Sequence, residues 1–310
     1  MSKFIHKTVM AAQSLAALNP AAGGRFADGT IGGGGHAEKI LDASSPTGWL
    51  FGFDRDGVAI EAARERLEQR FAGRYEIRRA NFSEMADWVP ADSCDGVILD
   101  LGVSSPQLDL AERGFSFQGD GPLDMRMDDR QVLTAADLVN GVSADELADI
   151  FWKFGGERDS RRFARAIAHD RAARKFETTR QLADLIERLA PRGGKKAHPA
   201  TKIFQALRIA VNDEVGSLKR GLEAAFRILK PGGRLAVITF HSLEDRVVKE
   251  FGRAKARDYA FSGAVDAPEF RQPREPEMKW VSRKAITPDE IELKENPRSR
   301  SAQLRVLEKL

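Results

Sequence analysis

Short apolar runs alternate with amphipathic segments along the first hundred residues, which is the pattern of βα units and of a parallel sheet. Between two of these runs, residues 56–71 carry apolar side chains close to helical spacing, with charges between them. The segment 96–100 is apolar up to a final aspartate, which is typical of a strand buried on both faces. The predicted strands are Arg25–Asp28, Gly48–Asp54, Tyr75–Arg78 and Gly96–Asp100.

The middle of the chain has a different rhythm. Between about residues 110 and 199 no run is as strong a strand candidate, and helical segments with one apolar side take over at 144–154, 161–172 and 179–189. We interpret residues 110–199 as a helical insertion between the fourth and fifth strands, with a role in substrate recognition. It contains the strongest basic cluster of the sequence, formed by Arg158, Arg161, Arg162, Arg165, Arg171, Arg174 and Lys175.

The α/β pattern resumes after residue 200. The elements expected there are a helix over 202–229, a helix stop and tight turn over 230–233, a strand over 234–240, a helix over 243–253, a surface loop over 256–298 and a strand over 301–307. The sequence therefore predicts a doubly wound α/β domain, residues 1–109 and 200–310, that is interrupted by the insertion.

Composition narrows the class of protein. The chain has 310 residues, of which 42% are hydrophobic, enough for a sizeable core. Positive and negative charges nearly cancel at +3, so any nucleic-acid footprint must come from local clustering. Cys94 is the single cysteine, which excludes an internal disulfide. No apolar run approaches the ~20 residues that cross a bilayer, so we expect a soluble, cytoplasmic protein with no membrane partner.

Glycines follow the first predicted strand directly. The segment Asp28–His36 reads DGTIGGGGH and opens a helix, where glycines allow close approach of a ligand and the helix presents unpaired N–H groups. Residues 32–37 satisfy G-x-G-x-x-A, which does not separate a dinucleotide from S-adenosylmethionine. Asp54 ends the next strand and is suited to bind ribose hydroxyls, although it could instead cap the following helix, a task for which Asp56 is also available. Together these features predict a nucleoside cofactor.

The segment Asp100–Asp109 leaves the sheet at its carboxyl edge, where open α/β folds bind ligands. A carboxylate at Asp100 can face both a cofactor and an incoming amino group. A nicotinamide-dependent oxidoreductase has no particular use for that arrangement, so the segment favours a different chemistry.

Eight stretches carry a family resemblance: Asp28–His36, Asp100–Asp109, Arg113–Phe117, Leu123–Met127, His198–Thr201, Phe204–Ile209, Phe240–Arg246 and Asn296–Ser301. In this order they resemble, over essentially the whole chain, the bacterial 16S rRNA cytosine-N4 methyltransferases. The resemblance implies a class I methyltransferase (Rossmann-like) fold and S-adenosylmethionine-dependent methylation of a cytidine in the decoding region of the small ribosomal subunit. Gln13 and Gly156 depart from the family pattern, where acids are usual.

The resemblance also implies roles for individual residues. It places Gly34, Gly35 and His36 against S-adenosylmethionine, Asp54 at its ribose, Phe82 beside its adenine, and Asp100 and Gln107 near its methionine end. We expect Asp100 to be the catalytic residue as well, accepting the amine hydrogens of cytosine together with backbone carbonyls of residues 101–103.

Substrate contacts are more open. Phe115 and Phe117 could stack on a flipped base or pack beneath a loop, and His241 could contact the substrate or cap a helix. The basic cluster, Arg298, Arg300 and Arg305 are expected at RNA phosphates. The five histidines show no metal-ligand spacing, so no metal is expected. The expected partner is 16S rRNA or the small subunit, a homodimer is compatible with the sequence, and the rival function is a non-catalytic RNA-binding or ribosome-assembly module.

Overall fold

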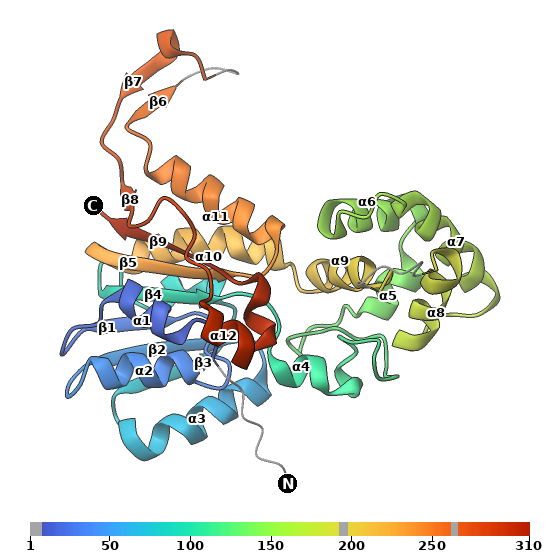
Figure 1. Cartoon of the computed structure of the whole chain (residues 1–310), viewed down its shortest axis with the longest axis horizontal. Helices are drawn as coiled ribbons and strands as arrows, with labels where there is room; N and C mark the ends of the chain where they lie inside the picture. The colour runs from blue at the N-terminus through green and yellow to red at the C-terminus, as the bar shows by residue number, and fades with distance from the viewer. Residues whose placement is uncertain (1–7, 192–197, 262–265) are drawn as a thin grey trace. The chain divides into compact units, whose positions relative to one another are not determined.

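The computed structural model describes residues 8–191, 198–261 and 266–310 (Figure 1). The chain divides into two compact units. The first comprises the described residues up to Gly102 together with Val215–Leu310, and the second comprises Val103–Glu214.

The first unit is built on a seven-stranded sheet in the order β3-β2-β1-β4-β5-β9-β8. Its strands are β1 (Arg25–Asp28), β2 (Trp49–Asp54), β3 (Tyr75–Arg79), β4 (Cys94–Asp100), β5 (Leu229–Thr239), β8 (Met278–Trp280) and β9 (Gln303–Lys309). Strands β1 to β5 pair in parallel, whereas β9 is antiparallel to both neighbours. The order reverses between β1 and β4, which is the switch point where such folds bind ligands. The predicted doubly wound fold is confirmed.

Helices cover both faces of this sheet (Figure 1). Val97 and Leu99 of β4 pack with α10 (Glu214–Ile228) and α11 (Ser242–Lys255). Ile98, between them in sequence, packs on the other face with α1 (Ala11–Leu18), α2 (Gly35–Ala43) and α3 (Gly57–Phe71). Because successive strand residues point to opposite faces, a strand with apolar residues throughout must be covered on both sides.

The second unit is helical. Its helices are α4 (Ser105–Asp109), α5 (Ala135–Gly141), α6 (Ala144–Gly155), α7 (Ser160–Ala173), α8 (Thr179–Leu189) and α9 (Thr201–Val211), with a 3₁₀ turn η2 (Ala111–Arg113). The three helices predicted here agree with α6, α7 and α8 to within one residue at each end. Ile203, Phe204 and Leu207 of α9 lie in the same core as Phe151 and Phe163, so the compact unit extends beyond residues 110–199.

The single helix predicted over 202–229 is wrong, because α9 and α10 are separate helices. The break falls at Asn212 and Asp213, and Asp213 adopts a positive φ of 45°. The Asn212 side chain accepts the N–H of Met127 and donates to the carbonyl of Met125, both at 2.8 Å. These long-range bonds hold the chain outside the helical conformation, and the apolar pattern carries no sign of them.

The surface loop predicted over 256–298 is also wrong. It contains β6 (Tyr259–Phe261), β7 (Arg271–Pro273), β8 and α12 (Glu290–Glu295), with 3₁₀ turns η3 (Pro268–Phe270) and η4 (Pro297–Ser301). Strands β6 and β7 form a hairpin, and β8 adds to the sheet by pairing with β9. Strands of three residues are too short to show an alternating pattern. Among the described helices, none is both long and apolar enough to cross a bilayer.

Candidate active site

Three carboxylates stand at one edge of the sheet. Asp28, Asp54 and Asp100 are the last residues of β1, β2 and β4, and β1 pairs with both of the other strands. Because these strands are parallel, their carboxyl ends share an edge, and the three acids flank the switch point. The positions of Asp54 and Asp100 agree with the strand ends expected from the sequence.

Asp28 is the most deeply buried of the three. Its Oδ1 accepts the N–H of Thr30 at 3.1 Å, while Oδ2 is buried and has no hydrogen-bond partner. Burial raises the pKa of Asp28 to about 7; His36 opposes this shift, and Asp100 and Asp54 add to it. The sequence identified Asp28 only as the start of the glycine loop. Its place between a buried strand and a glycine is the signal that could have marked it.

Thr30 and His36 connect the first and third carboxylates. The N–H of Asp100 donates to Thr30 Oγ1 at 2.6 Å, so one threonine contacts both acids. His36 Nε2 lies 3.5 Å from Asp100 Oδ2, which is within ion-pair range but is not a hydrogen bond. His36 Nε2 and Asp100 Oδ1 are therefore buried polar atoms without hydrogen-bond partners.

The glycine loop has a packed side and an open side. A methyl group built on Gly35 would stand 1.9 Å from Thr8 Oγ1, and one on Gly34 would stand 3.3 Å from Ala63 Cα. A methyl on Gly33 would meet no atom within 4 Å. Gly32 and Gly34 also adopt positive φ, which glycine tolerates best. The space for a ligand beside this loop therefore lies at Gly32 and Gly33, while cofactor contact by Gly34 and Gly35 stays a prediction.

Asp54 holds the loop rather than the following helix. Its Oδ2 accepts the N–H of Gly32 at 3.0 Å and its Oδ1 that of Asp56 at 2.9 Å, and burial raises its pKa. Asp56 caps α3 by accepting the N–H of Val58 at 3.0 Å. Each carboxylate oxygen has a second lone pair, so Asp54 can still accept ribose hydroxyls.

Phe82 begins the 3₁₀ turn η1 (Phe82–Asp87) and is buried beneath the start of the loop. A methyl on Gly221 of α10 would stand 2.3 Å from two carbons of its ring, and a methyl on Gly29 would stand 2.9 Å from its Cβ. The ring is thus a core side chain in contact with α10. Its place beside the adenine stays a prediction that rests on resemblance.

The remaining predicted residues have clear local environments. Phe115 is only 7% exposed in the core of the second unit, and Phe117 packs on His198 and Phe204 with ring centroids 4.5 and 4.9 Å away. Phe115 is therefore a core side chain, and Phe117 packs against that core while staying partly exposed. Gln107 is buried and accepts the N–H of Ser104 at 3.0 Å. Contacts of all three with cofactor or substrate stay predictions.

His241 caps a helix. Its Nδ1 accepts the N–H of Glu244 at 3.4 Å at the start of α11, and Glu244 accepts the N–H of His241 in return. Arg305 corrects an expectation, because its guanidinium pairs with Asp245 and is only 11% exposed, so it is not a surface cation for phosphate. Within the basic cluster, Arg171 turns inward to the carbonyl of Val139 at 2.7 Å, whereas the cations that are exposed are Arg158, Arg161, Arg162, Arg165, Arg174 and Lys175.

This edge fits S-adenosylmethionine. The cofactor carries a sulfonium and an ammonium, which carboxylates attract, and a ribose with two hydroxyls, which Asp54 can accept. The unpartnered atoms of Asp28, His36 and Asp100 need polar partners, because a buried polar atom without one is costly. A ligand with several polar groups would satisfy them.

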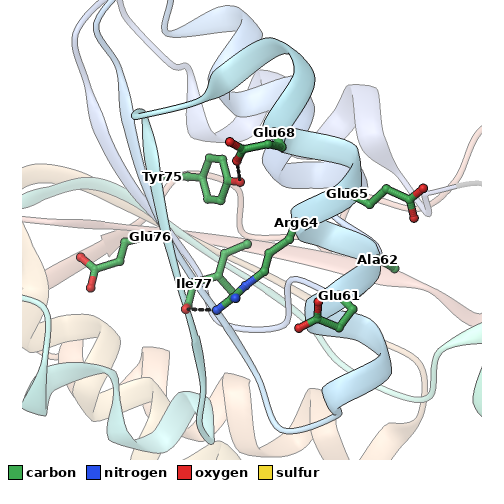
Figure 2. Close-up of a pocket in the computed structure, with 8 residues that line it drawn as sticks. All are labelled: Glu61, Ala62, Arg64, Glu65, Glu68, Tyr75, Glu76 and Ile77. Atoms are coloured by element: carbon green, nitrogen blue, oxygen red, sulfur yellow. Dashed lines mark hydrogen bonds between the residues drawn. The ribbon is translucent and has the colours of Figure 1, made fainter.

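A surface depression between α3 and β3 does not belong to this site (Figure 2). It lies toward the amino end of β3, where Tyr75 pairs with Leu50, whereas Asp54 pairs with Arg79 at the other end. Its lining residues, drawn in Figure 2, are Glu61, Ala62, Arg64, Glu65, Glu68, Tyr75, Glu76 and Ile77. Four glutamates would repel a polyanion, so the depression is not a phosphate-binding surface.

Comparison with known proteins identifies the family. The model of the MraW methylase family matches residues 3–310. Several relatives of the chain bear the name ribosomal RNA small subunit methyltransferase H. That of Geobacter sulfurreducens is 49% identical over 312 residues, covering 99% of both chains. That of Citrifermentans bemidjiense is 51% identical over 315 residues, covering 100% of both.

The relative from Xanthomonas oryzae pv. oryzae is 49% identical over 307 residues, which cover 98% of this chain and 89% of the other. Among solved structures, an rRNA methylase from Streptococcus thermophilus matches 99% of both chains at 11% identity with a TM-score of 0.44, a likeness too distant to support an argument. The sequence relatives are decisive: the chain belongs to the MraW methylase family.

Proposed function

We propose that this methylase transfers a methyl group from S-adenosylmethionine to the exocyclic N4 amine of a cytidine in the 16S rRNA of the small ribosomal subunit. The relatives' shared name supports ribosomal RNA of the small subunit as the substrate. The motif resemblance supports the N4 atom and the decoding region. The observation that carries the chemistry is the switch point, where three carboxylates and several unpartnered polar atoms adjoin the open side of a glycine loop.

S-adenosylmethionine, when bound, supplies a methyl group on a positively charged sulfur. In-line displacement at such a methyl needs proximity and orientation more than acid–base help. The lone pair of the cytosine amine is delocalised into the ring. An acceptor that binds the amine hydrogens favours the geometry in which this lone pair points at the methyl group. Asp100 Oδ1 is buried without a hydrogen-bond partner and can be that acceptor. The proton released from the amine passes to water.

Other residues at this edge of the sheet bind the cofactor and orient Asp100. Asp54 accepts the ribose hydroxyls, while its carboxylate also holds the loop by accepting the backbone N–H of Gly32. Thr30 holds Asp100 through the Asp100 N–H, and His36 Nε2 lies against the other oxygen of that carboxylate. The second unit, with its exposed basic cluster, is the substrate-recognition part of this proposal. We expect the activity in the cytoplasm, where ribosomal substrates occur. A homodimer is compatible with this proposal, and sedimentation velocity distinguishes it from a monomer.

The direct test uses labelled S-adenosylmethionine and small ribosomal subunits that lack the modification. After the reaction the RNA is digested to nucleosides and analysed by mass spectrometry. Label in N4-methylcytidine is the expected result. Label in another nucleoside would overturn the target atom, and no label despite measured cofactor binding would favour the assembly-module function.

The Asp100→Ala variant tests the catalytic role. We expect methyl transfer to fall by roughly 10²–10³-fold, as when one positioned hydrogen-bonding group is removed from other active sites. RNA binding should be retained, because Asp100 is a single acid at the sheet edge. Asp100→Asn is the matched control, since its amide oxygen keeps an acceptor and should retain more activity than alanine. Equal activity of the wild type and Asp100→Ala would remove Asp100 from the mechanism.

A further inference from the structure

Trp152 is an exposed tryptophan on α6 of the second unit. Its side chain is 57% exposed, whereas its neighbour Phe151 is fully buried in the core of that unit. A covered tryptophan removes a large apolar area from water, so an exposed one forgoes that stabilisation. Tryptophan is also enriched where proteins bind partners. The position of Trp152 therefore points to a bound molecule rather than to folding.

The helix ends in two glycines one turn after Trp152. The N–H of Gly156 donates to the Trp152 carbonyl at 3.1 Å, and Gly156 ends α6 with a φ of 58°. A methyl group on Gly156 would meet no atom within 4 Å. The C-terminal end of α6 therefore carries no side chain at Gly156, and the space beside its backbone is open.

Positive charges surround this end of α6. Lys202 of α9 donates to the Gly156 carbonyl at 3.1 Å, and its side chain is 52% exposed. Arg158, just before α7, and Arg161, in its first turn, are exposed. Of the nearby acids, Glu157 is only 13% exposed and lies 3.9 Å from Lys202, and Asp149 pairs with Lys153 at 2.9 Å. The exposed cations Lys153, Arg158, Arg161 and Lys202 outnumber the exposed acids Asp149 and Asp159, which favours a polyanion over an acidic protein surface.

We propose that Trp152 is a stacking platform for an unpaired base of the RNA substrate, with Arg158, Arg161 and Lys202 at the neighbouring phosphates. This inference rests on the proposed function, because RNA must be the substrate. Aromatic rings stack on any unpaired base, and cations beside them hold the backbone. Of the two phenylalanines that the sequence suggested for stacking, Phe115 is buried in the core and Phe117 is partly buried against it, whereas Trp152 is exposed on α6, a few residues before the basic cluster in sequence.

The test measures binding of a short single-stranded oligoribonucleotide of mixed sequence, and of its duplex with the complementary strand, by the full chain without cofactor. Trp152→Ala should weaken binding of the single strand by roughly 5- to 100-fold, the usual value of one stacked base. The affinity of the Trp152→Ala variant for the duplex should differ little from that of the wild type, because paired bases offer no free face. The slope of log affinity against log salt should be unchanged, since the indole carries no charge.

Four further variants make the result specific. Trp152→Leu keeps apolar bulk without a ring and should bind as weakly as Trp152→Ala. Arg161→Ala should weaken single strand and duplex alike and lower the salt slope by about one. Phe270→Ala removes a ring that is 52% exposed in the first unit and should leave binding unchanged. Thermal unfolding of each variant shows that the fold is retained, and Trp152→Phe, which keeps a smaller ring, should recover part of the affinity.

The outcomes separate this inference from the proposed function. If the wild type methylates subunit RNA while Trp152→Ala and Trp152→Leu bind the single strand as well as wild type does, the stacking inference fails and the function stands. If the substitutions change the sedimentation coefficient but not RNA binding, the indole contacts a second copy of the chain and the inference is again wrong. A wild type that neither binds nor methylates RNA would overturn both.

Discussion

The buried carboxyl of Asp28 makes the stability of the protein depend on pH. Its carboxyl has one backbone hydrogen bond and one oxygen without a partner. The pKa of 3.8 that it has in the unfolded chain rises to about 7 in the fold, because burial disfavours the charge. Between these pH values the unfolded state releases a proton that the folded state retains. The free energy of unfolding therefore falls as pH rises from about 4 to 7 and stays low above 7.

Replacing Asp28 by Asn removes the charge and keeps the acceptor for the Thr30 N–H. We expect Asp28→Asn without cofactor to be more stable than wild type at pH 8, with a free energy of unfolding higher by up to a few kcal/mol, given about 1.4 kcal/mol per pKa unit. The difference should shrink as pH falls from 7 to below 4, where the unfolded wild type also takes up the proton. Affinity for S-adenosylmethionine should fall. Calorimetry across this pH range checks the trend, and a difference that does not depend on pH would contradict it.

Capping residues set where several helices begin, and a glycine sets how closely one helix packs on its neighbour. The helices α5, α6 and α8 each begin with a capping box, formed by Thr134 and Asp137, Ser143 and Glu146, and Thr178 and Gln181. Such pairs satisfy the free N–H groups of the first turn, so they set the start of a helix before any tertiary contact. The packing of α10, in contrast, depends on Gly221, because the Phe82 ring fills the place of a side chain.

The Gly221→Ala variant tests this contact. Alanine favours a helix over glycine by about 1 kcal/mol, but its methyl would stand 2.3 Å from the Phe82 ring. Overpacking of this kind typically costs about 1–3 kcal/mol, so we expect a net loss of stability and weaker cofactor binding if Phe82 borders the adenine. Gly141→Ala in α5 is the control, because a methyl there meets nothing within 4 Å and should be neutral or stabilising. Denaturant unfolding that ranks Gly221→Ala with Gly141→Ala would refute the expected clash.

At the scale of the whole molecule, the chain forms two units with separate cores, and each holds a different candidate binding surface. The first holds the sheet edge with its three carboxylates, and the second holds the basic cluster and Trp152. A ligand that binds only the folded state stabilises it by about 2.7 kcal/mol at a concentration of 100 Kd. Binding should therefore be visible as local protection in the unit that makes the contacts.

Hydrogen exchange with S-adenosylhomocysteine maps the site. We expect slower exchange at Gly32–Gly35 and around Asp54 and Asp100, and little change in α6, α7 and α8. Slower exchange at residues 103–109 would support the role predicted for Gln107. Protection of the depression between α3 and β3 in place of the glycine loop would move the cofactor site and contradict the proposal.

Much of the site could be predicted from the sequence because it depends on order along the chain. A buried parallel strand has its carboxyl end at a fixed edge, so Asp54 and Asp100 could be placed there from the apolar runs that precede them. The helices α6, α7 and α8 followed from their apolar periodicity. The motifs also identified the family, which the relatives confirm.

Only the tertiary structure decided the features that depend on residues far apart in sequence. The break at Asn212 comes from hydrogen bonds to the segment around Met125, and β8 exists because β9 pairs with it. Phe115 is buried and Trp152 is exposed, although both are aromatic residues near helices. Periodicity reports which side of one element is apolar, whereas burial and pKa depend on what covers that side. The sequence by itself therefore determined the order of elements and the sheet edge, and packing determined which side chains at that edge and in the insertion are free to bind.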